Sequence, residues 1–177
     1  DAKYVLKEAL NKTPDDLLLN LTLSEIYELQ QDTIAAANQL EKFLQLWEGK
    51  HGKEVAGGTA ENFGIYIRIG NLYFIAKQYD KAEEYFRKAS TVLPDDPTPY
   101  FWLAVLSEEN KNYASAIKYL EKTLKYKNFT DTATYIRLSY YYSQLKNAKK
   151  SVKILEKSIK SASDSPEIHF FLRSEEH

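Results

Sequence analysis

Residues 63–96 read FGIYIRIGNLYFIAKQYDKAEEYFRKASTVLPDD, and this stretch decides the fold. Its apolar and small side chains recur at steps of one, three or four residues, which places them on one face of a helix in each half. These positions are Tyr66, Ile69, Gly70 and Tyr73 in the first half, and Ala82, Phe86 and Ala89 in the second. Pro94 ends the second helix, and Asp95 and Asp96 offer carboxylates that can cap a following helix.

This unit resembles the tetratricopeptide repeat, a helix–turn–helix unit of 34 residues. A position within the unit is called a column below, so that Phe63 occupies column 1. The family has aromatic residues at columns 4 and 11, small residues at columns 8 and 20, and proline at column 32, and this unit fits all of them. The same columns recur in units that begin at Leu17, Pro97 and Thr132.

The resemblance implies an all-α fold, a right-handed superhelical α-solenoid of antiparallel helix pairs with a continuous core. Small residues at columns 8 and 20 let the two helices of a pair approach closely. The expected segments are the second helix of a truncated repeat (1–16), repeats at 17–50, 63–96, 97–131 and 132–165, and the first helix of a further or capping repeat (166–177).

Residues 51–62 are a Gly-rich insertion into this pattern. We expect the helix over Ile34–Trp47 to extend into it and a loop to follow. A surface insertion is the favoured interpretation, and a loop that contacts a partner is the alternative.

Composition excludes several functional classes. The chain has 177 residues, with 24 Lys and Arg against 25 Asp and Glu, so it is not a generally basic nucleic-acid binder. It has no cysteine, which excludes disulfides and thiolate chemistry, and no run approaches the roughly 18 apolar residues of a membrane span. The three histidines are far apart, and no residues have the spacing of a catalytic or phosphate-binding motif. We therefore expect no catalytic residues, metal, cofactor or small-molecule substrate.

The resemblance also implies a binding surface, because the first helices of the family line a concave groove that meets protein or peptide ligands. The residues at the corresponding columns here are Leu21, Glu25, Ile67, Arg68, Asn71, Phe74, Phe101, Trp102, Val105, Ile136, Arg137, Tyr140 and Phe170. They predict an apolar groove in which Arg68 and Arg137 set the register of the ligand. Packing between repeats is an equal alternative for the apolar residues of column 5. Trp102 lies outside the core columns and is expected to be exposed. Ile67 and Ile136 stand where the chaperone-binding members have lysine, so that ligand is not predicted.

Charge is distributed unevenly along the chain. Residues 97–165 carry 12 Lys and Arg against 6 Asp and Glu, a net charge of +6. Lysines of one second helix form a convex basic face, at Lys149, Lys153, Lys157 and Lys160. This face is interpreted first as a solvated surface and second as a docking site for an acidic partner or anionic lipid. Nucleic acid is disfavoured, because the aromatic residues are expected on the opposite side.

The leading hypothesis is a non-enzymatic interaction module or scaffold that binds a peptide or helix of a partner in the apolar groove. The alternative is a structural spacer, or a segment that self-associates through exposed end helices. A third hypothesis is an enzyme whose catalytic domain lies outside this sequence.

Overall fold

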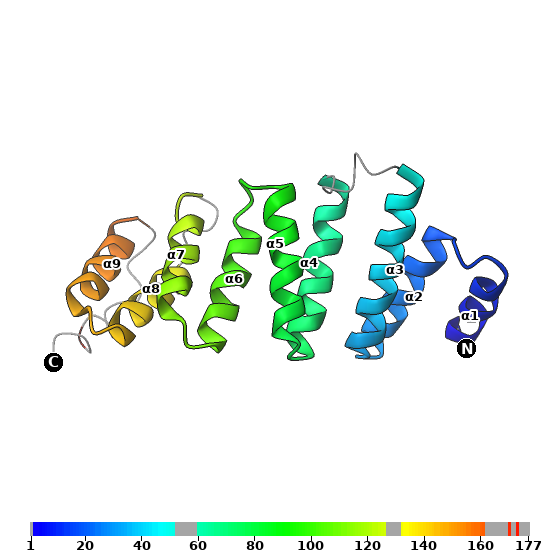
Figure 1. Cartoon of the computed structure of the whole chain (residues 1–177). Helices are drawn as coiled ribbons and strands as arrows, with labels where there is room; N and C mark the ends of the chain where they lie inside the picture. Colours follow the sequence, from blue (N-terminus) through cyan, green and yellow to red (C-terminus); the bar gives the residue numbers. More distant parts are fainter. Residues whose placement is uncertain (1, 52–59, 127–131, 162–169, 171–172, 174–177) are drawn as a thin grey trace. The chain divides into compact units, whose positions relative to one another are not determined.

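The computed structural model describes residues 2–51, 60–126, 132–161, 170 and 173, and within these ranges every regular element is a helix (Figure 1). The helices are α1 (Ala2–Lys12), α2 (Leu17–Leu29), α3 (Thr33–His51), α4 (Ala60–Ile75), α5 (Tyr79–Val92), α6 (Thr98–Glu109), α7 (Tyr113–Thr123), α8 (Thr132–Gln144) and α9 (Ala148–Ser161). They form two compact units, Asp1–Asp95 and Asp96–His177. The prediction of an all-α fold is confirmed.

Each expected repeat is a pair of packed helices. In the first unit α2 packs on α3 and α4 on α5, and in the second unit α6 packs on α7 and α8 on α9. The small residues at columns 8 and 20 lie where paired helices meet, and all of them are buried. They are Ser24, Gly70, Ala104 and Ser139 at column 8, and Ala36, Ala82, Ala116 and Ser151 at column 20. In the last pair the contact is direct, since the hydroxyls of Ser139 and Ser151 lie 2.7 Å apart.

The turns inside the four pairs share one backbone geometry. The residue at column 15 has a left-handed conformation in each turn, with φ between 55° and 59°. These residues are Gln31, Lys77, Lys111 and Lys146. The next residue directly precedes the second helix, and the side chains of Asp32, Asn112 and Asn147 accept a hydrogen bond from a backbone N–H three residues later. Gln78, at the same column, makes no such bond.

Aromatic residues at columns 4 and 11 fill the core of each unit. Tyr66, Tyr100 and Tyr135 at column 4, and Tyr73 and Tyr142 at column 11, are all buried. Phe86 at column 24 has no exposed surface, and its ring lies against Gly70. The interior is therefore built from large rings that lie against small residues at the helix crossings.

Around the insertion, the structure confirms the expected extension of the preceding helix and differs in where the next helix begins. Helix α3 continues past Trp47 to His51, whose ring stacks on Trp47 with the centroids 4.3 Å apart. Helix α4 begins at Ala60, three residues before the expected start at Phe63. Residues 52–59, the proposed loop, lie outside the described residues, as do His169 and His177. No helix in the described ranges has the length and hydrophobicity needed to cross a bilayer.

Candidate functional site

The first helices of the first unit carry six of the residues expected to bind a partner. Leu21 and Ile67 are half-buried between helices, and Glu25 is exposed on α2. Arg68 of α4 forms an ion pair with Glu28 of α2, with Nη2 and Oε1 2.6 Å apart. The guanidinium therefore joins adjacent repeats.

Two further expected residues of the first unit lie on α4. Asn71 is partly buried, and its Oδ1 is buried without a hydrogen-bond partner in the described part of the chain. The ring of Phe74 contacts that of Tyr79, with centroids 5.6 Å apart. The polar group of Asn71 is thus incompletely satisfied, while Phe74 is partly engaged in packing.

In the second unit, α6 and α8 place the corresponding residues together. Phe101 and Trp102 meet edge to face at 5.7 Å between ring centroids, and the Arg137 guanidinium lies over the Phe101 ring at 5.6 Å. Arg137 is also 3.5 Å from Glu108, whose carboxylate accepts a 2.5 Å hydrogen bond from Tyr141. Trp102 and Val105 are half-buried, so the expectation of an exposed tryptophan is wrong. The Phe101 ring is one of the contacts of Trp102.

A cavity of about 390 Å³ opens beside these residues. It is lined by Glu108, Ala133, Ile136, Arg137 and Tyr140, so three of the expected residues share one recess. Tyr140 is 41% exposed, and its ring meets Tyr113 edge to face at 6.1 Å. Phe170, also expected here, is 69% exposed, and its neighbours along the chain are outside the described residues.

The two Arg–Glu pairs follow one rule. Each joins column 6 of a repeat to column 12 of the preceding repeat, as Arg68 to Glu28 and Arg137 to Glu108. In the sequence, column 12 of the repeat at 63–96 is Phe74 and column 6 of the repeat at 97–131 is Trp102. Both arginines expected to contact the ligand therefore already have a carboxylate partner within this chain.

A second repeated cluster was missed by the sequence reasoning. In each unit a tyrosine of a first helix donates a hydrogen bond to a glutamate of the preceding repeat, and a lysine lies over the tyrosine ring. The clusters are Glu41, Tyr73 and Lys81 in the first unit, and Glu121, Tyr142 and Lys150 in the second. The hydrogen bonds are 2.8 and 2.6 Å long, and the lysines lie 4.7 and 5.2 Å from the ring centroids. The recurrence of Glu, Tyr and Lys at columns 25, 11 and 19 could have revealed it.

These clusters change the acidity of the tyrosines. Burial, followed by the hydrogen bond to Glu121 and the charge of that carboxylate, raises the pKa of Tyr142 to about 12. Burial and Glu41 likewise raise the pKa of Tyr73 and of Tyr85 well above the ordinary value. Each phenol is therefore held in its neutral, hydrogen-donating form.

The expected basic face lies on α9. Lys149, Lys153 and Lys157 are exposed, while Ser151 and Leu155 of the same helix are buried. The side chain of Lys160 lies outside the described residues. A second cavity, of about 490 Å³, is lined by Lys153 and Lys157 together with other residues of α7, α8 and α9. In the described parts of the chain no three His, Cys, Asp or Glu side chains come together to hold a metal ion.

Comparison with known sequences connects these features to a family. Tetratricopeptide repeat profiles match residues 65–96, 97–129 and 132–165, which together are more than half of the chain. Anaphase-promoting complex subunit 6 of Arabidopsis thaliana is 27% identical over 97 residues, which cover 52% of this chain and 18% of that protein. The chain thus spans less than a fifth of the length of this curated relative.

Solved structures have the same fold at low sequence identity. The MamA protein superposes with a TM-score of 0.72 at 20% identity, over 90% of this chain and 80% of its own. YrrB, a tetratricopeptide repeat protein with an unusual peptide-binding site, superposes with a TM-score of 0.68 at 13% identity, over 96% of this chain and 81% of its own. Identities this low establish the shared fold alone.

Proposed function

This chain belongs to the tetratricopeptide repeat family, and on that premise we propose that it binds a segment of another protein on the surface of its first helices. Proteins built from these repeats generally serve as interaction modules without chemistry of their own. In this proposal the chain is a scaffold whose ligand is a peptide or a helix of a partner. YrrB, which shares the fold, has a peptide-binding site.

The observation that carries the proposal is the cavity beside α8. It brings Ile136, Arg137 and Tyr140 to one recess of about 390 Å³, large enough for one side chain of a ligand. Aromatic residues and arginine are the types most often responsible for affinity at protein interfaces. A partly exposed tyrosine beside an isoleucine offers apolar area and a phenol that can make a hydrogen bond.

The ion pairs refine how a ligand would be held. Because Arg137 is 3.5 Å from Glu108, it presents a partly neutralised cation above an aromatic ring rather than a free charge. Apolar burial would then supply most of the binding free energy, with Arg137 contributing polar contacts. We accordingly expect binding to depend weakly on salt concentration, since screening acts mainly on exposed charges.

The test is selection of binding peptides from a random display library against the whole chain, followed by affinity measurements on variants. Selected peptides should be rich in aromatic or aliphatic residues and should bind the double variant Ile136→Ala/Tyr140→Ala at least tenfold more weakly, a loss of about 1.4 kcal/mol. Leu145→Ala is the matched control, because Leu145 is an exposed apolar residue that does not line this cavity. Circular dichroism would establish that all variants fold. Equal binding to the wild type and the double variant, or a library that yields no binder, would contradict the proposal.

A second candidate function is self-association, and the apolar surface of α1 and the start of α2 favours it. Tyr4, Val5 and Leu18 are each at least 62% exposed. Exposed apolar side chains are candidates for a surface that another chain covers. Sedimentation velocity over a range of concentrations would test it, because Tyr4→Ser/Val5→Ser should abolish any concentration-dependent association. A monomer at every concentration would exclude this candidate.

A further inference from the structure

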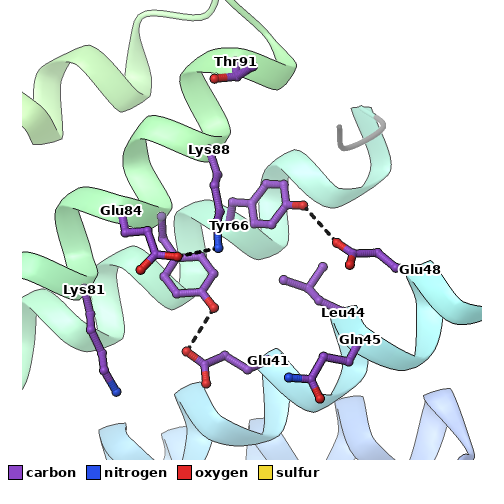
Figure 2. Close-up of a pocket in the computed structure, with 10 residues that line it drawn as sticks. Glu41, Leu44, Gln45, Glu48, Tyr66, Lys81, Glu84, Lys88 and Thr91 are labelled. Atoms are coloured by element: carbon purple, nitrogen blue, oxygen red, sulfur yellow. Dashed lines mark hydrogen bonds and ion pairs between the residues drawn. The ribbon is translucent and has the colours of Figure 1, made fainter. Parts of the chain in front are cut away.

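A larger cavity lies in the first unit, away from the surface of first helices described above. It has a volume of about 650 Å³ and is bounded by α3, α4 and α5, as Figure 2 shows. Carboxylates of Glu41 and Glu48 lie along the α3 side, with Tyr66 opposite Glu48. The hydroxyl of Tyr85 reaches Glu41 from α5. The two tyrosine rings lie 6.2 Å apart, and although both residues are largely buried, each contributes to the cavity lining, so that they form an aromatic wall.

The hydrogen bonds around the cavity hold these carboxylates in place. Tyr73 and Tyr85 both donate to Oε1 of Glu41, at 2.8 and 3.0 Å. Tyr66 donates to Glu48 at 3.5 Å, a longer and weaker contact. Phenol hydroxyls donate hydrogen bonds to a carboxylate without bringing a positive charge to it.

The lysines that line the same cavity already contact other groups of the first unit. Lys88 is 2.6 Å from Glu84 and lies over the Tyr85 ring at 4.5 Å from its centroid. Lys81 lies over the Tyr73 ring. Within the described residues no lysine, arginine or histidine nitrogen comes within ion-pair distance of Glu41 or Glu48. The cavity therefore combines a wall of aromatic rings with two carboxylates that have no cationic partner among the residues the structure describes.

The second unit offers a natural comparison. Its cavity of about 490 Å³ also has a Glu–Tyr–Lys cluster, at Glu121, Tyr142 and Lys150. However, Lys153 and Ile154 occupy the columns that hold Glu84 and Tyr85 in the first unit. A Glu–Tyr–Lys cluster thus lies at or beside each cavity, whereas isoleucine replaces Tyr85 of the aromatic wall in the second unit. The Glu–Tyr–Lys cluster joins adjacent repeats in both units, whereas Tyr85 is a group of the first cavity that a ligand could contact.

We propose that the cavity between α3, α4 and α5 binds an arginine side chain of a protein partner. A guanidinium is flat and weakly hydrated, stacks on aromatic faces, and pairs with a carboxylate through two N–H groups. The wall of Tyr66 and Tyr85 offers aromatic rings to the flat guanidinium, and the carboxylates of Glu41 and Glu48 offer acceptors for its N–H groups. A lysine ammonium has no flat face to lie against a ring, so arginine is the preferred occupant. This site lies on different residues from the surface of the proposed function, and either can fail without the other.

The experiment is a two-dimensional amide NMR titration of the whole chain with acetyl-arginine amide, with acetyl-citrulline amide as the uncharged probe of nearly the same shape. The arginine probe should produce saturable shifts of amides around the cavity, such as those of Gln45 and Tyr85, and citrulline should bind at least tenfold more weakly. Glu48→Gln should weaken arginine binding at least tenfold, and Glu41→Gln should do the same if that variant folds. Glu121→Gln is the matched control, since it changes the equivalent glutamate of the other unit and should leave binding unchanged.

Three results would overturn the proposal. One is the absence of saturable shifts with the arginine probe. Another is equal binding of arginine and citrulline, which would remove the role of the carboxylates. The third is tighter binding of acetyl-glutamate amide than of the arginine probe, which would assign the cavity to its lysines instead.

Discussion

Replacing Gly70 with alanine tests the close packing that the repeat requires. A Cβ atom added at Gly70 would lie 2.5, 2.8 and 2.9 Å from three atoms of the Phe86 ring. Ordinary van der Waals contacts of a Cβ begin at about 3.4 Å, and the Phe86 ring is fully buried among other side chains. The ring or the helices would have to move by several tenths of an ångström, and overpacking of this kind costs about 1–3 kcal/mol.

The same helix provides the matched control. Gly64 also lies in α4, and a Cβ added there would meet nothing within 4 Å. Both substitutions gain the helix propensity of alanine over glycine, about 1 kcal/mol, so this term cancels in the comparison. We expect Gly64→Ala to stabilise the chain by about 0.5–1 kcal/mol, and Gly70→Ala to be about 1–3 kcal/mol less stable than Gly64→Ala.

Urea unfolding followed by circular dichroism measures this difference. The urea midpoint of Gly64→Ala should be higher than that of the wild type, and the midpoint of Gly70→Ala should be lower than that of Gly64→Ala. The dependence of the unfolding free energy on urea concentration should not change. Phe86→Leu should reduce the cost of Gly70→Ala, because leucine has no ring atoms at the position of the clash. A Gly70→Ala variant as stable as Gly64→Ala would refute the packing argument.

Three further predictions follow from single contacts. Ser151→Ala should lower the free energy of unfolding by about 1 kcal/mol, because it leaves the buried Ser139 hydroxyl without this partner. The double variant Ser139→Ala/Ser151→Ala should be nearly as stable as the wild type. Additive losses in a double-mutant cycle would contradict this prediction. Gln78→Asn should raise the free energy of unfolding by about 0.5–1 kcal/mol, because the backbone of Gln78 (φ −88°, ψ 69°) matches that of the capping residue Asn112. Thermal or urea unfolding measures this gain, and no gain would show that the cap does not form. Because the pKa of Tyr142 is raised from 10.0 to about 12, the stability that this group contributes is fully present below pH 10 and is lost as the pH rises through 12. Glu121→Gln should lower that pKa in a phenolate absorbance titration, and an unchanged curve would remove the assigned cause.

The helical pairs could be predicted from sequence because the information is local. Side-chain periodicity over a dozen residues indicates which face of a helix is buried, and small residues at columns 8 and 20 indicate where two helices cross. Gly70 is an example, since its position in the repeat alone predicted that a larger residue would be excluded. The turns could be predicted only in part, because the left-handed residues Gln31 and Lys77 are not the residue types that favour that conformation.

The sequence by itself therefore determined the all-α repeat fold and which side chains share a helix face. Only the tertiary structure decided which of those side chains are already paired. Arg68 has Glu28 as its partner across 40 positions of the chain, and Tyr73 has Glu41 across 32. Such pairs depend on the distance between side chains of adjacent repeats, which periodicity within one helix does not contain. The cavity beside Glu41 and Glu48 has the same origin, since α3, α4 and α5 each supply part of its lining.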